Sequence, residues 1–90
     1  CPTSILEAFT FSVPVVAYKI DGIPELVDDG IDGLLFQPGN FRELAKGIIS
    51  LLSNPEKIRD MGASGKRKVE KHFMLQEMVK KHNTYFLRLK

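Results

Sequence analysis

The stretch that decides the fold is Cys1–Glu25, CPTSILEAFTFSVPVVAYKIDGIPE. After Thr3 and Ser4 it becomes dense in apolar residues and carries a single charge, Glu7, which predicts a short and mostly buried helix. A carboxylate in so apolar a segment costs free energy unless it is exposed, capped or paired. Glu7 is therefore a candidate ligand contact, and a structural role with a local partner is an equally weighted alternative.

The second half of this stretch predicts a parallel strand that leads into a turn. Val13–Tyr18 is an unalternating β-branched run, as in strands covered on both faces, and Pro14 fits near its start. In Asp21–Glu25, Gly22 suits a tight turn and Pro24 suits the first turn of a short helix. Open α/β sheets bind ligands at the carboxyl ends of parallel strands, so we expect this turn to lie beside the amino end of the first helix.

The remaining sequence predicts one further strand and two or three helices. A strand is expected over Gly33–Phe36, and Asn40 with Glu43 three residues later forms a capping-box start for the next helix. That helix has an apolar stripe expected to cover the sheet, formed by Phe41, Leu44, Ala45, Ile48, Ile49 and Leu52. Asn54-Pro55 then begins a helix in which Gly62, Ala63 and Gly65 would permit close packing, and a separate helix is expected over residues 74–90.

The order of residues 4–40 resembles the carboxyl-terminal half of the retaining, GT-B-fold glycosyltransferases of family 4. The pattern of that family includes E-A-M-A-x-G-x-P-V-V-A-x-x-x-G-G-x-P-E, followed by spaced glycines and a proline. The matching residues are Glu7-Ala8, Pro14-Val15-Val16-Ala17, Gly22, Pro24-Glu25, Val27, Gly30, Gly33, Leu35, Pro38 and Asn40. The resemblance implies an α/β fold, namely part of a Rossmann-like parallel-sheet domain that ends in two or three helices.

The resemblance also implies a site for a nucleotide-sugar donor. Glu7 matches the second glutamate of the Glu-x7-Glu motif, which in the family usually binds the ribose hydroxyls. The backbone amides at the helix start would face the donor diphosphate, because they lack intrahelical partners and lie at the positive end of the helix dipole. The residues at this helix start are Thr3, Ser4, Ile5 and Leu6.

Asp21, Gly22 and Glu25 form a candidate site loop, although Glu25 would equally well favour the first turn of its own helix through the dipole. Two departures from the family pattern fall at the helix start and in the site loop. Pro2 stands where the family has a glycine, and proline brings no N–H group. Asp21 replaces the first glycine of the usual Gly-Gly pair.

The resemblance implies that residues 1–90 are part of a carboxyl-terminal domain that binds the donor while a hexose passes, with retention, to an acceptor hydroxyl. The first motif glutamate would lie two residues before Cys1, and the chain opens in mid-motif, so we expect a piece of a longer enzyme that is inactive by itself. No residue is assigned a catalytic role and no cofactor is expected. The helix over residues 74–90 is expected to pack on the amino-terminal domain of such an enzyme. The acceptor, whether a sugar, a lipid-linked or a small molecule, is unknown.

Composition excludes several other classes of protein. Ninety residues form at most one domain, and a single cysteine excludes an internal disulfide framework. His72 and His82 are too far apart to form a helical ligand pair, so no metal site is expected. Asp28, Asp29 and Asp32 lack the spacing of a calcium loop and are expected to serve turns and solvation. The expected compartment is the cytoplasm.

Charge is unevenly divided along the chain. Residues 1–65 hold 5 Lys or Arg and 9 Asp or Glu, whereas residues 66–90 hold 8 and 2. This basic tail is expected to be a solvated helix face that does not bind nucleic acid, because no recognition-helix or stacking-aromatic pattern accompanies the charge. Peripheral membrane contact is left open. The alternative function is thus a non-catalytic α/β nucleotide-binding or interaction module with a basic helical tail.

Overall fold

In the computed structural model of the chain, the backbone is described for residues 2–89 and the side chains for residues 3–81. The elements in chain order are α1 (Pro2–Thr10), β1 (Val15–Tyr18), α2 (Ile23–Leu26), β2 (Gly33–Phe36), α3 (Phe41–Leu52) and α4 (Pro55–Leu89). Within the described residues, β1 and β2 form a parallel two-stranded sheet whose register runs from Val15 opposite Gly33 to Tyr18 opposite Phe36. The predicted parallel pairing is therefore confirmed.

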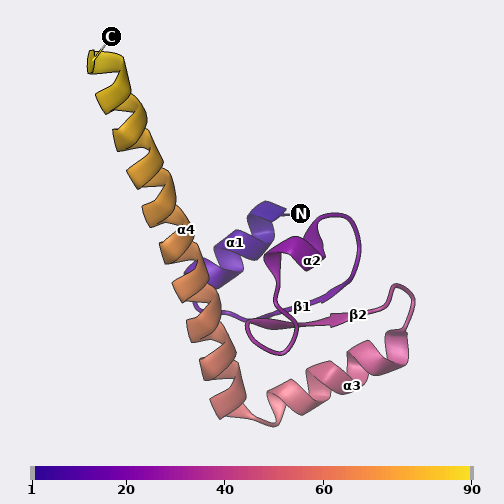
Figure 1. Ribbon diagram of the computed structural model, residues 1–90. Coiled ribbons are helices and arrows are strands. Elements are labelled where there is room, and N and C mark those ends of the chain that lie inside the picture. The colour runs from indigo at the N-terminus through magenta and orange to yellow at the C-terminus, as the bar shows by residue number, and fades with distance from the viewer. Residues whose placement is uncertain (1, 90) are drawn as a thin grey trace.

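The sheet lies between helices. Figure 1 shows α1 and α2 on one side of the strands and α3 on the other, with α4 running past one end. Contacts join α1 to β1, α3 to both strands and α4 to β2. All four residues of β1 are half-buried, as expected for a strand with helices on both sides in so small a sheet.

The hydrophobic core is formed on the α1 side of the sheet. Its buried residues are Ile5 and Phe9 of α1, Val27 after α2, and Leu35 of β2, with half-buried Val15, Ala17, Ile23, Leu26 and Val69 around them. The side chains of β2 alternate between the two faces, so Leu35 joins this core whereas Phe36 faces α3. Helix α1, which the sequence predicted to be mostly buried, thus supplies two of the four buried residues of this cluster.

Helix α3 covers the other face, but not with the whole stripe that the sequence predicts. Its N-cap is Asn40, whose side chain accepts a hydrogen bond from the Glu43 N–H group at 3.4 Å, as predicted. Gly47 lies tightly against the sheet, since an added Cβ there would lie 2.4 Å from the Phe36 ring. The residues that turn inward are therefore Leu44, Gly47 and Leu51, while Phe41, Ile49 and Leu52 of the predicted stripe stay exposed.

The seam between α1 and α4 depends on two glycines. An added Cβ at Gly62 would lie 1.9 Å from the Ser12 carbonyl oxygen, and one at Gly65 would lie 2.5 Å from the Phe9 ring. Only residues without a side chain permit so close an approach, which confirms the role predicted for these positions. Ser12 itself takes φ of 59°, in the left-handed region, at the place where the family pattern has a glycine.

Helix α4 is continuous from Pro55 to Leu89, so the prediction of a separate helix over residues 74–90 is wrong. Asn54 caps its start by accepting from the Lys57 N–H group at 3.2 Å, and Pro55 is its first residue, both as predicted. No glycine, proline or capping residue lies between Phe73 and Leu75, and Met74 is a good helix former, so nothing stops the helix there. Its far half extends away from the other elements (Figure 1).

The exposed part of α4 is rich in apolar side chains. Phe73, Met74, Leu75, Met78 and Val79 are each more than half exposed. Over the part of the chain that the structure describes, no helix is apolar enough along a sufficient length to cross a membrane. His82 and the last basic residues, Arg88 and Lys90, lie outside the described side chains.

Candidate functional site

The amino end of α1 presents its first turn to solvent. Thr3 and Ser4 are exposed, whereas Ile5 is buried in the core, so Ile5 offers only its backbone to a ligand. The amides of this turn have no partners within the helix. Pro2 occupies the first helical position, which suits proline because an N–H group there would be unpaired in any case.

Glu7 lies one turn further along the exposed side of α1, beside Leu6, which is 38% exposed. Among residues 3–81, no hydrogen bond or ion pair to the Glu7 carboxylate is present, although its backbone carbonyl accepts from the Phe11 N–H group. Because Glu7 is exposed to solvent, its carboxylate does not incur the free-energy cost of burial in an apolar helix. The alternative role, a structural contact with a local partner, is not observed among these residues. The carboxylate is free to accept hydrogen bonds from a ligand.

The candidate site loop follows β1 directly, and all three of its residues are exposed. Its tight conformation resides at Asp21, which has φ of 49°, whereas Gly22 has an ordinary φ of −86° and serves as the N-cap of α2. The turn predicted at Gly22 is therefore present, and its left-handed residue is Asp21. The left-handed residue falls at the first position of the family's Gly-Gly pair, and aspartate tolerates this region better than most residues.

The fold brings part of the predicted site together. Helices α1 and α2 are in contact, and Leu6 and Glu25 line the same hollow of about 350 Å³. The other residues around it are Leu26, Lys68, Val69 and His72. Thus Glu25 meets α1 across this hollow, while Glu7, Asp21 and Gly22 do not line it.

Lys68, which lines this hollow, makes three polar contacts. The sequence did not predict a site role for it. Its ammonium is 2.8 Å from Asp28 Oδ2, is ion-paired with Asp32 Oδ2, and donates a hydrogen bond to the Leu26 carbonyl at 2.9 Å. Burial lowers the pKa of Lys68, but the hydrogen bonds to the two carboxylates and their negative charges outweigh it, so the pKa lies above its ordinary value.

These contacts correct the roles expected for two residues. Asp32 is fully buried rather than solvated, and its Oδ1 accepts a hydrogen bond from the Asp28 N–H group at 2.8 Å. Lys68 belongs to the expected solvated tail but is held inside by Asp32. The turn role expected of Asp29 is confirmed, since its Oδ1 accepts from the Leu35 N–H group at 3.0 Å. The available signal was the position of Asp32, one residue before a buried strand.

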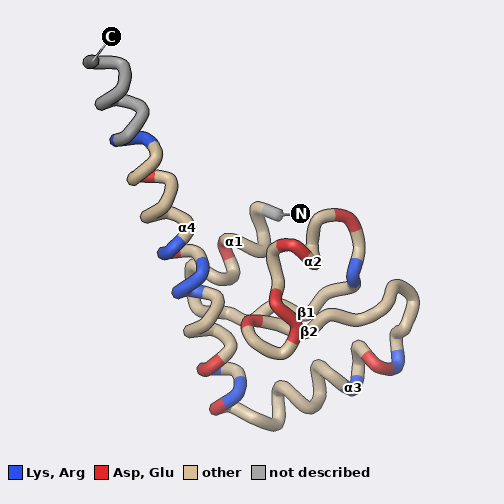
Figure 2. The backbone as a smooth tube through the Cα atoms, viewed as in Figure 1, with Lys and Arg blue, Asp and Glu red and all other residues tan. Residues whose placement is uncertain are grey.

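Positively and negatively charged residues gather on different elements of the fold. In Figure 2, Lys and Arg recur along α4, while Asp and Glu gather around α2 and the loop that follows it. Among the side chains of residues 3–81, no three histidine, cysteine, aspartate or glutamate residues cluster in a way that could hold a metal ion.

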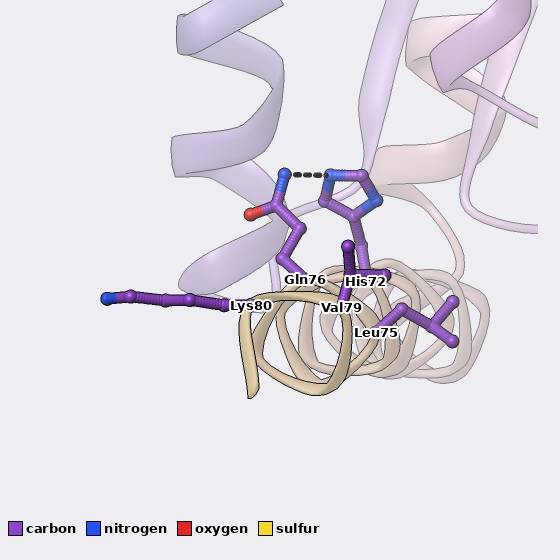
Figure 3. A pocket seen from close by; sticks show the side chains of 5 residues that line it. All are labelled: His72, Leu75, Gln76, Val79 and Lys80. Atoms are coloured by element: carbon purple, nitrogen blue, oxygen red, sulfur yellow. Dashed lines mark hydrogen bonds between the residues drawn. The ribbon is translucent and has the colours of Figure 1, made fainter. Parts of the chain in front are cut away.

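A second hollow lies on α4 alone and is mainly apolar. Figure 3 shows its lining residues, His72, Leu75, Gln76, Val79 and Lys80, all from one side of the helix. His72 Nε2 and Gln76 Nε2 are 3.2 Å apart. The partner of His72 is thus an amide one turn along the helix, in keeping with the surface role expected of this histidine.

Comparisons with known proteins agree on one family. Residues 1–68 match the family model described as glycosyl transferases group 1. The N-acetyl-alpha-D-glucosaminyl L-malate synthase of Bacillus anthracis is 30% identical over 82 residues, which are 91% of this chain and 22% of that protein. The alpha-maltose-1-phosphate synthase of Mycolicibacterium smegmatis is 36% identical over 74 residues, which are 76% of this chain and 19% of that protein.

A solved structure shows the same arrangement. The sucrose-phosphate synthase of Thermosynechococcus elongatus superposes with a TM-score of 0.75 at 25% identity, covering 92% of this chain and 22% of that chain. This likeness confirms the predicted fold class, an α/β unit built on a parallel sheet. The chain spans about a fifth of the length of these relatives.

Proposed function

Because the chain belongs to the glycosyl transferases group 1 family, we propose that it is the donor-binding part of the carboxyl-terminal domain of a family 4, GT-B-fold enzyme. The donor is a nucleotide-sugar, and the reaction moves a hexose to an acceptor hydroxyl with retention of configuration. The observation that carries the proposal is the exposed, unpaired carboxylate of Glu7 on the same helix as an exposed amino-terminal turn, within residues 3–81.

The two features of α1 suit two different parts of a nucleotide-sugar. The unpaired amides of Thr3 and Ser4, in the first turn of α1, would donate hydrogen bonds to the diphosphate, where the positive end of the helix dipole also favours negative charge. The Glu7 carboxylate would accept hydrogen bonds from the ribose hydroxyls. Amides fixed at a helix start stabilise the diphosphate as it departs, since its negative charge increases as the bond to the sugar breaks.

The loop after β1 is proposed to complete the donor site. Asp21, Gly22 and Glu25 lie at the carboxyl end of a parallel strand, where open α/β sheets bind their ligands. The contact between α1 and α2 supports this proposal, because it places the helix that contains Glu25 beside the helix that contains Glu7. No catalytic residue is assigned to this chain, which is proposed to bind the donor without turning it over by itself.

The proposal is tested by titrating the chain with UDP-glucose, ADP-glucose and GDP-mannose and following backbone amide shifts by NMR. Replacing Glu7 by Gln removes a charged acceptor, and such hydrogen bonds contribute about 1.5–3 kcal/mol, so the Kd for the preferred donor should rise about 10- to 100-fold. Glu70→Gln is the matched control, because Glu70 is an exposed carboxylate on α4. Equal donor affinity in Glu7→Gln and the wild-type chain would remove the proposal.

The alternative, an interaction module driven by the basic tail, is less well supported. Lys68, one of the basic residues of that tail, is paired internally with two aspartates. Binding through the tail would weaken steeply with added salt, whereas recognition of ribose hydroxyls by Glu7 depends less on ionic strength. Repeating the titration at two salt concentrations separates the two functions.

For the exposed apolar side of α4, we propose a contact with the amino-terminal domain of such an enzyme. Met74, Leu75, Met78 and Val79 are more exposed than is usual for apolar side chains of a folded protein. Peripheral membrane contact is the competing proposal, supported by Lys80 and Lys81 on the same helix. Co-sedimentation of the chain with vesicles containing phosphatidylserine would favour the membrane.

A further inference from the structure

One ammonium group of α4 contacts the elements on which the proposed donor site is built. Lys68 Nζ donates to the carbonyl of Leu26, the last residue of α2, and pairs with Asp28 and Asp32 in the loop before β2. It also lies 5.5 Å from the centroid of the Phe9 ring of α1, within the range of a cation–π contact. The side chain therefore joins α1, α2 and α4 at one point.

Helix α2 depends on such contacts for its position. It is a single turn of four residues, and an isolated turn of this length is unstable because helix nucleation is costly. Its N-cap, Gly22, has no side chain to bond the first amides. Two features anchor its carboxyl end, namely the burial of Val27, which is 1% exposed, and the hydrogen bond from Lys68 to Leu26.

The position of Lys68 is in turn fixed by Asp32. The Asp32 side chain is 1% exposed, and its other oxygen is occupied by the Asp28 N–H group. Removing one partner of a buried ion pair is costly because it leaves an uncompensated buried charge, so the ammonium is held where α2 ends. The hydrogen bond to Leu26 then follows, and Leu26 is the residue directly after Glu25.

We propose that Lys68 is a positioning residue for the donor site: it fixes the α2 turn, and with it Glu25, against α1 without touching the donor. The inference rests on the proposed function, because it concerns the site formed by α1 and α2. It adds a residue that lies 42 positions along the chain from Leu26 and outside every segment assigned to the donor.

The test compares donor affinity in folded protein. Lys68→Met keeps the apolar stem and removes the charge, Lys68→Arg restores a charge that can meet both carboxylates, and Lys66→Met is the control at an exposed position of the same helix. Each variant is titrated with UDP-glucose, ADP-glucose and GDP-mannose at a temperature where circular dichroism shows it fully folded. Lys68→Met should raise the Kd about 3- to 30-fold, Lys68→Arg should recover most of the loss, and Lys66→Met should bind as the wild type does.

A second readout follows α2 without any donor. The Val27 N–H group, which donates to the Ile23 carbonyl, should exchange its hydrogen faster in Lys68→Met, while amides in the middle of α3 should not change. If Lys68→Met does not fold, Asp28→Asn takes its place, because it removes one exposed arm of the contact and leaves Asp32 paired. A smaller rise in Kd, of about threefold, is then expected.

The outcomes separate the two proposals. If the wild-type chain binds none of the three donors, the proposed function fails and this inference fails with it. If the wild-type chain binds a donor and Lys68→Met binds it equally well, Lys68 is merely structural and only this inference is overturned. An equal loss in Lys66→Met would also overturn it, because the effect would then be one of general charge.

Discussion

Replacing Gly62 by alanine should destabilise the chain, although alanine is the better helix former. An added Cβ would lie 1.9 Å from the Ser12 carbonyl oxygen and 2.7 Å from the Ser12 carbonyl carbon. Both atoms are backbone, and the turn that holds them is closed by two hydrogen bonds, from the Ser12 N–H group to Phe9 and from the Val13 N–H group to Ala8. This Schellman turn cannot rotate away as a side chain would.

The magnitude follows from two opposing terms. Alanine gains about 1 kcal/mol over glycine inside a helix. A carbon and an oxygen normally approach no closer than about 3.3 Å, so α1 and α4 would have to separate by more than 1 Å. Overpacking costs typically about 1–3 kcal/mol, and the rigid neighbour places this site at the upper end, so the net loss in the free energy of unfolding should be about 2 kcal/mol.

Urea denaturation followed by circular dichroism measures this loss. Gly65→Ala is a graded comparison, because its Cβ would meet the Phe9 ring, a side chain that can shift, and its loss should be smaller. Lys66→Ala, at an exposed position of the same helix, should stay within about 0.5 kcal/mol of the wild type. A Gly62→Ala chain as stable as the wild type would refute the close backbone approach of α4 to Ser12.

Four further substitutions test two residues with a positive φ, one helix cap and the charge of Lys68. Ser12→Gly should raise the free energy of unfolding by about 0.5–1 kcal/mol, because Ser12 has a positive φ. Asp21→Gly should raise it less in the same urea assay, because aspartate tolerates a positive φ better than serine does. A larger gain for Asp21→Gly than for Ser12→Gly would contradict this reasoning. Asn54→Ala should cost about 1 kcal/mol by removing the cap of α4, and an unchanged urea midpoint would show that the cap contributes nothing. The pKa of Lys68 is raised in the folded chain, so its charge stabilises the fold most below the ordinary pKa of 10.5. The difference in the free energy of unfolding between the wild type and Lys68→Met should therefore be constant below pH 10.5 and shrink as the pH rises through the higher folded pKa. A difference that grows above pH 10.5 would contradict this.

Local signals were sufficient to predict most elements of this fold. The β-branched run before Tyr18 predicted a covered strand, because such residues pack well on a pleated surface with helices on both sides. Asn40 and Asn54 predicted the starts of α3 and α4, since a cap depends only on a side chain and the backbone three residues later. Features that depend on neighbours in sequence were therefore readable without the structure.

Features that depend on distant residues were not readable in the same way. Asp32 and Lys68 were taken as solvated because counting charges treats each residue alone, and nothing within a few positions of either one indicates their pairing. The inward side of α3 was misplaced for a related reason. Its contact is set by the Phe36 ring, which enters beside Gly47, and periodicity counts apolar residues but not the absence of a side chain.

The candidate site lies between these two cases. The sequence predicted that Glu7 would be exposed or paired, and exposure is what the structure shows. The sequence predicted a tight turn at Gly22, which is present, but it did not indicate that Asp21 would be the residue with a positive φ. Asp21 and Ser12 both stand where the family pattern has a glycine, and both adopt a positive φ that costs more for a residue with a side chain.

One side of α4 sets the positions of both helices of the proposed site. Gly62 and Gly65 admit α1, and Lys68, three residues further along, holds the end of α2. The two contacts act differently, because the glycines exclude any side chain from the seam whereas Lys68 supplies a charge that a buried carboxylate requires. Enlarging a glycine should therefore lower stability in proportion to the clash. Loss of the charge at Lys68 should in addition release the α2 turn, so donor affinity and stability need not fall together when α4 is altered.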